Sequence, residues 1–193
     1  IRKFNETLTN LRERGYDLKD IDVFAVGKKA ADTAVKAGFQ LDEDFTDLAD
    51  KPSYDRAVDL ASELIDLFSD GEVEQVIFIY SHMASTSSQP VIRENYLPLA
   101  LHDYASGTYP EDYILEPDPM SLVKELLPKV LLLKMYTVVL DANAAEHAAR
   151  TVAMQVATDN AQDLISELTL AYNKGRQQEI TAEILDLIGG TIA

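Results

Sequence analysis

Residues 144–174 read AAEHAARTVAMQVATDNAQDLISELTLAYNK, a segment rich in small side chains and free of glycine and proline. Neither helix breaker occurs anywhere in residues 129–174, so no residue there forces the chain to turn. Pro128 suits the first position of a helix, where its missing N–H has no partner to lose, and Gly189-Gly190 supplies a stop. The sequence therefore predicts one long helix of about 60 residues, or about 90 Å at 1.5 Å per residue.

Small and apolar residues of this predicted helix repeat in alternating steps of four and three, the spacing of a coiled-coil seam. After Val156 the seam shifts by one residue, which resembles a register discontinuity. Alanine-rich seams bring helix axes close together, so a second helix is implied, and no comparable helix is found elsewhere in the chain. The two runs are Leu131, Met135, Val138, Ala142, Ala145, Ala149, Val152 and Val156, then Ala157, Ala161, Leu164, Leu168, Ala171 and Gly175.

A hairpin is the alternative to one continuous helix. Asn143 and Glu146 have the three-residue spacing of a capping box, so a break near residues 141–143 would fold the chain back. No glycine or proline accompanies this cap, and the continuous helix is therefore favoured.

Composition limits the classes of function. The chain has 193 residues, 47% of them hydrophobic, which allows one good core and an appendage. Its formal charge of −16 opposes binding to nucleic acid, and no run approaches the roughly 18 apolar residues of a membrane span. Without cysteine there is no disulfide or cysteine-ligated zinc. We expect no cofactor, no nucleic-acid partner and no direct membrane insertion.

The first two thirds of the chain alternate between helical and strand patterns. Residues 21–26 and 76–80 are short apolar runs typical of strands, and the second resembles a strand buried on both faces. With a helix between them they predict a parallel unit joined by a crossover. Helical spacing predicts helices at residues 1–14, 30–37 and 53–68.

Two further segments, residues 90–101 and 113–115, could add edge or antiparallel strands. The predicted fold class is therefore α/β: a small Rossmann-like open sheet domain in residues 1–127, followed by a long C-terminal coiled-coil helix in residues 128–193.

Two loops are candidate chemical sites. The Val26-Gly-Lys-Lys29 turn lacks the spaced glycines of a P-loop or dinucleotide site, which favours a surface turn. Residues 81–88 follow the second predicted strand and hold Ser81 and His82, but no G-x-S-x-G elbow is present. A small α/β hydrolase using this loop is therefore an alternative. His102-Asp103 and His147 show no metal-ligand spacing.

Four motifs follow one another along the chain: EHAARTVAM from Glu146 to Met154, Ala157-Thr-Asp-Asn-Ala161, LTLAYNKGRQ in residues 168–177, and Ile180-Thr181. Together they closely resemble the γ subunit of F-type ATP synthases. The resemblance implies a central shaft with an α/β domain at its foot. It further implies an antiparallel coiled coil of the N- and C-terminal helices, running into the ring of α and β subunits. We expect the N-terminal helix to be missing from this sequence, which begins at Ile1.

The resemblance also assigns roles to residues. It implies contacts between β-subunit loops and Arg176, Gln177 and Thr181. Ala145, Thr151 and Gly175 depart from the family, which commonly has serine, methionine and alanine there. The middle motif, whose implied role is shaft packing, comprises Glu146, Arg150, Met154, Thr158 and Asn160.

The function implied is a non-catalytic rotary central stalk. It would couple proton or sodium flow through a membrane ring to ATP synthesis or hydrolysis in the head. Implied partners are the α and β subunits, the ε subunit and the membrane rotor ring, and the implied place is peripheral on the cytoplasmic face of the cell membrane. A γ-like adaptor or self-associating coiled-coil protein that has lost its N-terminal half is the alternative from another class.

Overall fold

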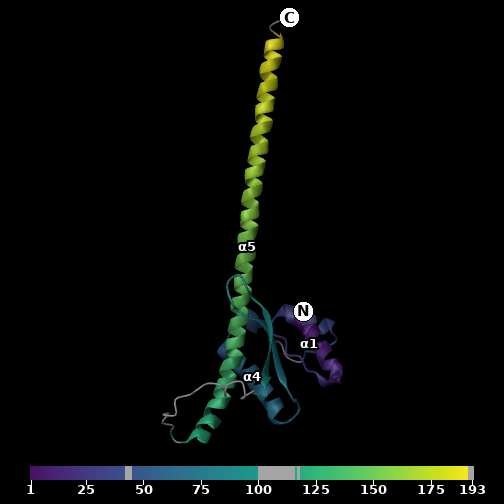
Figure 1. The fold of residues 1–193 in the computed structure, drawn as a ribbon, viewed down its shortest axis with the longest axis vertical. Helices are drawn as coiled ribbons and strands as arrows, with labels where there is room; N and C mark the ends of the chain where they lie inside the picture. Colours follow the sequence, from purple (N-terminus) through teal and green to yellow (C-terminus); the bar gives the residue numbers. More distant parts are fainter. Residues whose placement is uncertain (42–44, 100–115, 117, 191–193) are drawn as a thin grey trace. The chain divides into compact units, whose positions relative to one another are not determined.

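A computed structural model of the chain describes residues 1–41, 45–99, 116 and 118–190. The chain divides into two compact units, Ile1–Ala149 and Arg150–Ala193. A single helix, α5 (Pro119–Gly190), contributes its first part to the first unit and its later part to the second (Figure 1). The long C-terminal helix predicted from the sequence is thus confirmed, and so is the α/β class of the fold.

The helices of the first unit follow the predicted apolar spacing. α1 (Arg2–Glu13), α2 (Lys28–Lys36) and α4 (Tyr54–Ser69) confirm the three predicted helices. α1 ends before Gly15, whose φ of 99° lies in the left-handed region that favours glycine. Two short elements complete the set, the 3₁₀ helix η1 (Leu18–Asp20) and α3 (Thr46–Asp50).

Two strands form the sheet that the structure describes. β1 (Val76–Ser81) pairs antiparallel with β2 (Val91–Leu97), with Ile79 opposite Arg93 and Phe78 opposite Glu94. The strand predicted at residues 76–80 is confirmed, and residues 90–101, for which the sequence leaves open an edge or an antiparallel strand, contain the antiparallel strand β2. β1 is not buried on both faces as predicted, because only Val76 and Phe78 are buried and the other four residues are half-buried.

The predicted strand at residues 21–26, and with it the parallel unit, is wrong. These residues lie outside the sheet, and within the described part of the chain β1 pairs only with β2. Ile21 and Val23 pack against one apolar cluster whereas Phe24 and Val26 pack against another. The apolar pattern therefore reflects burial on two sides of a connecting segment. The edge strand predicted at residues 113–115 falls outside the described residues.

The main core lies between one face of the sheet, α4 and the first part of α5. Phe78 and Tyr96 stack on that face with ring centroids 4.4 Å apart. A smaller cluster joins α1 to α2 and includes the edge-to-face pair Phe4 and Phe39. The main core contains Phe45, Leu48, Ala57, Leu60, Ala61, Leu64, Val76, Phe78, Tyr96, Leu97, Leu131, Met135, Val138 and Val139.

α5 begins nine residues before the predicted start at Pro128. Asp118 caps it, because its Oδ1 accepts hydrogen bonds from the backbone N–H groups of Met120 and Ser121, each at 3.0 Å. Hydrogen bonds from Ser121 hold the pKa of Asp118 below its usual value. Pro119 takes the first helical position that sequence reasoning had given to Pro128, which instead lies inside the helix. The pair of cap and proline is the stronger start signal.

The C-terminal end of α5 is as predicted, since the helix runs to Gly190. It also passes through residues 141–143 without interruption, so the hairpin alternative is wrong.

Truncation of a buried residue of α5 tests the packing of its first part. Met135 is 2% exposed, so Met135→Ala should lower the free energy of unfolding by about 2–5 kcal/mol. Leu133, two residues away and 56% exposed, provides the control, and Leu133→Ala should change stability by less than about 0.5 kcal/mol. Urea unfolding followed by tyrosine fluorescence measures both. Equal losses in the two variants would contradict the described packing.

Candidate partner-binding surface

Asp141 links α5 to the loop that follows β1. Its Oδ2 lies 2.6 Å from Nδ1 of His82, and its Oδ1 accepts the backbone N–H of Met83 at 2.9 Å. Burial raises the pKa of Asp141, but hydrogen bonds from His82 and Met83, with the charge of Lys134, outweigh it and hold the pKa below its ordinary value. The carboxylate is therefore ionised at neutral pH and attracts the loop after β1.

Glu94 links both strands to α5. One oxygen accepts the hydroxyl of Tyr80 at 3.0 Å, and the other forms an ion pair with Lys134 at 2.8 Å. Burial and the hydrogen bond to Glu94 raise the pKa of Tyr80 to about 12. On the same face Tyr96 donates its hydroxyl to the carbonyl of Leu131 at 3.0 Å, and burial raises the pKa of Tyr96 to about 12.

Asn143 supplies a further link, because its Nδ2 donates to the carbonyl of Ala49 at 2.7 Å. Sequence reasoning considered residues 141–143 only as a helix break, the alternative to the favoured continuous helix, and did not find these contacts. A sequence signal did exist: Lys134 and Asp141 are seven residues apart, which places them on one helix face.

For the hydrolase alternative, the structure places an acid, Asp141, beside His82, but the described residues place no nucleophile there. Among the described residues no serine hydroxyl is hydrogen-bonded to the His82 ring, and the backbones of Ser85 and Ser88 bond to each other. The His82–Asp141 pair serves as a link between elements.

Other chemical hypotheses find little in the structure. Gly27, with a φ of 97°, is the N-cap residue that precedes α2, and Lys28 and Lys29 after it are exposed, as in a surface turn. The described part of the chain holds no group of three residues suited to bind a metal, and His102-Asp103 lies outside it. None of the described helices combines the length and apolar character needed to cross a bilayer.

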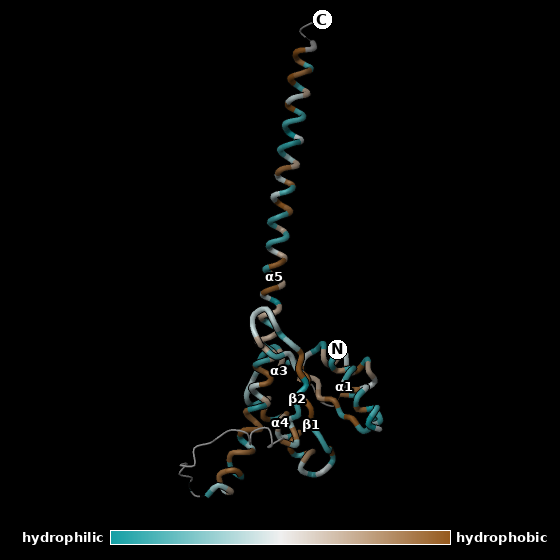
Figure 2. Tube along the Cα trace, in the orientation of Figure 1, coloured by the Kyte–Doolittle hydropathy of each residue, from teal (hydrophilic) through white to brown (hydrophobic). Residues whose placement is uncertain are grey.

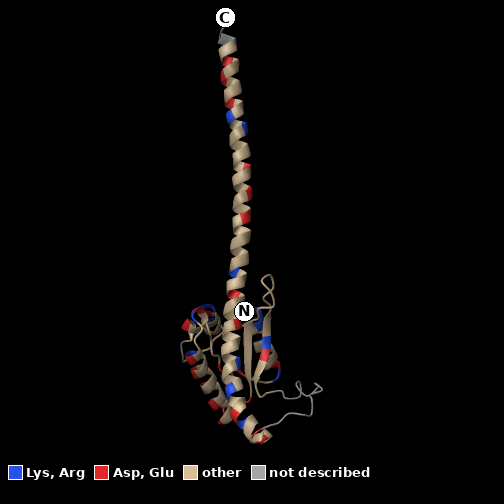
Figure 3. Ribbon diagram, turned by 90° about the vertical axis from the view of Figure 1, so that its left-hand side faces the viewer, with Lys and Arg blue, Asp and Glu red and all other residues tan. Residues whose placement is uncertain are grey.

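The second unit presents a long apolar surface. Every residue in 150–188 is exposed, and large apolar residues recur along this part of α5 (Figure 2). No charged residue occurs in residues 151–158 (Figure 3). A helix with this much exposed apolar surface gains stability when other chains cover it. The exposed set is Val152, Met154, Val156, Leu164, Ile165, Leu168, Leu170, Tyr172, Ile180, Ile184, Leu185, Leu187 and Ile188.

The predicted seam has two environments. Its early residues pack into the core of the first unit, whereas its later residues face outward. The structure buries Leu131, Met135, Val138 and Ala145, half-buries Ala142, and exposes Ala149, Val152, Val156, Ala157, Ala161, Leu164 and Leu168.

The middle-motif residues Glu146, Arg150, Met154, Thr158 and Asn160 are all exposed on α5. Thr158 uses its hydroxyl locally, donating to the carbonyl of Met154 at 2.9 Å. Their predicted role in shaft packing stays a prediction.

Arg176, Gln177 and Thr181, the predicted docking residues, are also exposed. Gln177 and Thr181 line one shallow hollow together with Lys174 and Leu185. Thr181 donates its hydroxyl to the carbonyl of Gln177 at 2.7 Å, so it contributes mainly its methyl group and an acceptor to this surface. Docking by these residues stays a prediction.

A small α/β unit, together with a long helix whose later part exposes large apolar side chains, defines a class, the stalk-like subunits of larger assemblies. Residues 1–193 match the family model described as ATP synthase. The chain belongs to the ATP synthase gamma chain family, which confirms the resemblance read from residues 146–181.

Three bacterial proteins illustrate the similarity to curated relatives. The ATP synthase gamma chain of Bacteroides fragilis is 46% identical over 197 residues, covering 100% of this chain and 67% of the relative. That of Phocaeicola vulgatus is 48% identical over 180 residues, covering 91% of this chain and 62% of the relative. That of Dehalococcoides mccartyi is 38% identical over 173 residues, covering 90% and 60%. The chain thus spans about two thirds of the length of the curated relatives it matches.

Solved structures share the fold. A cryo-EM structure of Euglena gracilis mitochondrial ATP synthase with OSCP, F1 and c-ring gives a TM-score of 0.54 at 22% identity, covering 98% of this chain and 66% of that one. The rotor of the same enzyme gives 0.50 at 21% identity, covering 91% and 68%. At these identities the likeness concerns the fold alone.

Replacing Asp141 by asparagine tests the link between α5 and β1. Because the folded pKa of Asp141 lies below its ordinary 3.8, the carboxylate stabilises the fold above that pH, and this contribution is lost as the pH falls through the folded pKa. Asp141→Asn should cost about 1–3 kcal/mol at pH 7, and the difference from the unaltered chain should shrink below about pH 4. Urea unfolding at several pH values measures it.

The exposed Asp163→Asn on the same helix is the control and should stay within about 0.5 kcal/mol at every pH. A pH-independent loss in Asp141→Asn would contradict the ionic link.

Gly175 offers a test of the second unit by itself. A Cβ added there meets no atom within 4 Å, so Gly175→Ala should stabilise the helix by about 1 kcal/mol. The reverse change at an exposed neighbour, Ala171→Gly, should destabilise it by a similar amount. Amide hydrogen exchange of residues around position 175 measures both, and slower exchange in the glycine variant would contradict the prediction.

Proposed function

We propose that this chain forms the rotary central stalk of an F-type ATP synthase, with residues 1–127 as its foot and residues 128–193 as its shaft. It couples ion flow through the membrane ring to ATP synthesis or hydrolysis in the head. The observation that carries the proposal is the family match over residues 1–193 together with the exposed apolar surface of α5 over residues 149–188.

The contacts of α5 support the mechanical part of the proposal. A shaft that passes motion from one end to the other needs a firm attachment at its base. Leu131, Met135 and Val138 are buried in the core of the first unit, and Asp141 and Lys134 add polar links to the strands. Apolar and ionic contacts together therefore attach the first part of α5 to the rest of the first unit.

The chain contributes to catalysis by changing the populations of its partners' conformations. A shaft whose surface differs around its axis contacts each surrounding subunit differently. Each orientation then binds one set of subunit conformations better than the others, and rotation shifts those populations in turn. No bond chemistry is assigned to the chain itself.

The surface divides between partners. We assign the exposed seam from Val152 to Leu168 to a second helix of a coiled coil, because its steps of four and three are those of a paired helix. Arg176, Gln177 and Thr181 are assigned to the β-subunit loops. The α and β subunits of the head surround the shaft.

The foot is assigned to the ε subunit and the membrane rotor ring, on family membership alone. The complex is membrane-associated, and the chain would sit peripherally on the cytoplasmic face of the cell membrane. Its charge of −16 is consistent with partners that are proteins and not nucleic acid.

Assembly is tested by tagging the natural full-length product in its own cells and isolating it in mild detergent. Recovery of α, β and ε subunits with the membrane-ring protein in fixed stoichiometry supports the stalk. Recovery of the product alone, or with itself only, contradicts the stalk and favours the adaptor or self-associating coiled coil.

Replacing Arg176, Gln177 and Thr181 together by alanine should weaken coupling. A loss of about 1.4 kcal/mol of contact energy corresponds to a tenfold effect, and we expect coupled ATP synthesis in membranes to fall by about that factor. The matched control replaces Gln155, Gln162 and Ser166, also polar and exposed on α5, by alanine. Tyrosine fluorescence should show the first unit unchanged in both. Full coupled synthesis in the first variant would rule out docking by this patch.

A further inference from the structure

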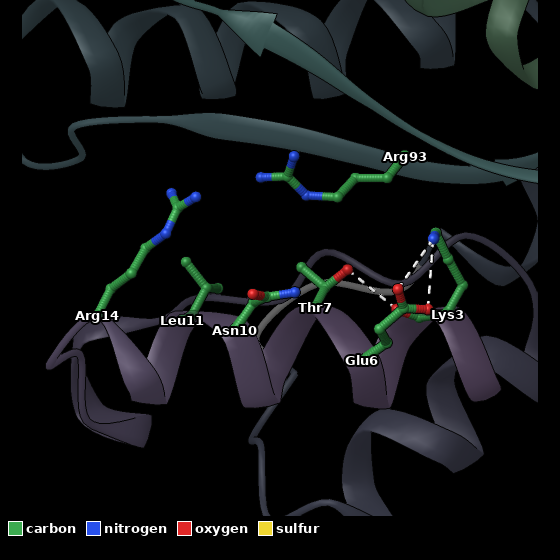
Figure 4. A pocket seen from close by; sticks show the side chains of 7 residues that line it. All are labelled: Lys3, Glu6, Thr7, Asn10, Leu11, Arg14 and Arg93. Atoms are coloured by element: carbon green, nitrogen blue, oxygen red, sulfur yellow. Dashed lines mark hydrogen bonds and ion pairs between the residues drawn. The ribbon is translucent and has the colours of Figure 1, made fainter.

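A hollow of about 220 Å³ lies between α1 and β2, in the first unit (Figure 4). Six lining residues come from α1 or its C-terminal cap and one, Arg93, from β2. Three of the lining side chains are cationic, Lys3, Arg14 and Arg93, against the single carboxylate of Glu6. The hollow is thus positively charged in a chain that carries 33 acidic and 17 basic residues.

Two of the polar groups in the hollow are already engaged. Lys3 Nζ lies 3.2 and 3.3 Å from the two carboxylate oxygens of Glu6. Thr7, which is buried, donates its hydroxyl to the backbone carbonyl of Lys3 at 2.9 Å. These two interactions hold one end of the hollow in place and leave the rest of its charge unbalanced.

Arg14 and Arg93 lack an acidic partner: among the described residues, no carboxylate forms an ion pair with either guanidinium. Arg14 extends from the end of α1 and Arg93 from β2, and their guanidinium groups reach the same space, with Asn10 on the helix beneath (Figure 4). Two cations that face one another repel. An anion between them would replace that repulsion with charge-assisted hydrogen bonds from both sides.

We propose that this hollow binds a small multivalent oxyanion of the phosphate class, held between Arg14 and Arg93 with the amide of Asn10 as an additional donor. Guanidinium groups present paired N–H donors that match the oxygens of such anions. A volume of about 220 Å³ is below the roughly 300–1,000 Å³ of ordinary ligand pockets, which suits a phosphate group with at most a small substituent. Both arginines are exposed, so salt screens their charges and binding is weak.

This site is independent of the stalk function. Its residues lie on α1 and β2, and none of them belongs to the seam or the docking residues of α5. Failure of either proposal leaves the other standing.

The test is a titration of the 193-residue chain with inorganic phosphate, followed by amide chemical shifts, with sodium chloride adjusted to hold ionic strength constant. We expect saturable shifts at Asn10, Arg14 and Arg93. Arg93→Gln and Arg14→Gln should each raise the apparent dissociation constant at least tenfold. Arg12→Gln removes a charge from the same helix but outside the hollow, and should leave it within twofold.

Thermal unfolding of each variant confirms that the fold is retained. Shifts that grow linearly without saturation, or equal affinity in Arg93→Gln and Arg12→Gln, overturn the proposal. An equal response to acetate at the same ionic strength also overturns it, because a site of the phosphate class should prefer the multivalent ion.

A second titration, with glycerol phosphate, distinguishes a phosphomonoester from free phosphate as the ligand. Saturation by glycerol phosphate, with the same dependence on Arg93, assigns the hollow to phosphomonoesters. Saturation by inorganic phosphate alone assigns it to the free ion. Both results support the proposal.

Discussion

The burial of Leu131, Met135 and Val138 against the sheet and α4 is the contact on which the rest of the structure depends. An isolated helix is limited by the cost of its first turn, whereas each further residue adds a hydrogen bond at little cost. The first unit holds that costly turn in place by packing the early part of α5 into its core. Residues 150–188 can then continue the helix although all of them are exposed.

Helices and sheet were predictable to different extents. Periodicity located α1, α2 and α4 because their apolar faces are buried at helical spacing, as Ala57, Leu60, Ala61 and Leu64 show. The strand predicted at residues 21–26 was wrong because an apolar run indicates burial but does not show which backbone groups form hydrogen bonds. Pro128 misled because a proline inside a long helix looks like a start until the stronger signal at Asp118-Pro119 is considered.

The spacing of the seam residues on α5 was predictable from the sequence, but which of them are buried and which are exposed was not. The same alternating spacing describes Leu131, which is buried in the first unit, and Leu168, which is 60% exposed. Spacing alone does not say which surface covers a seam. The pair of His82 and Asp141 was beyond prediction for another reason, since its members are 59 residues apart and meet only when α5 packs on β1.

The alternation of side chains along β2 has a consequence for the accuracy of folding. Arg93 faces the hollow beside α1, whereas its neighbour Glu94 points to the other face and pairs with Lys134. Sliding the strand by one residue would exchange these faces and set Arg93 against Lys134, and it would expel the ring of Tyr96 from the core. Two adjacent residues of opposite charge thus penalise a misaligned hairpin, so that only one alignment satisfies both faces of the sheet.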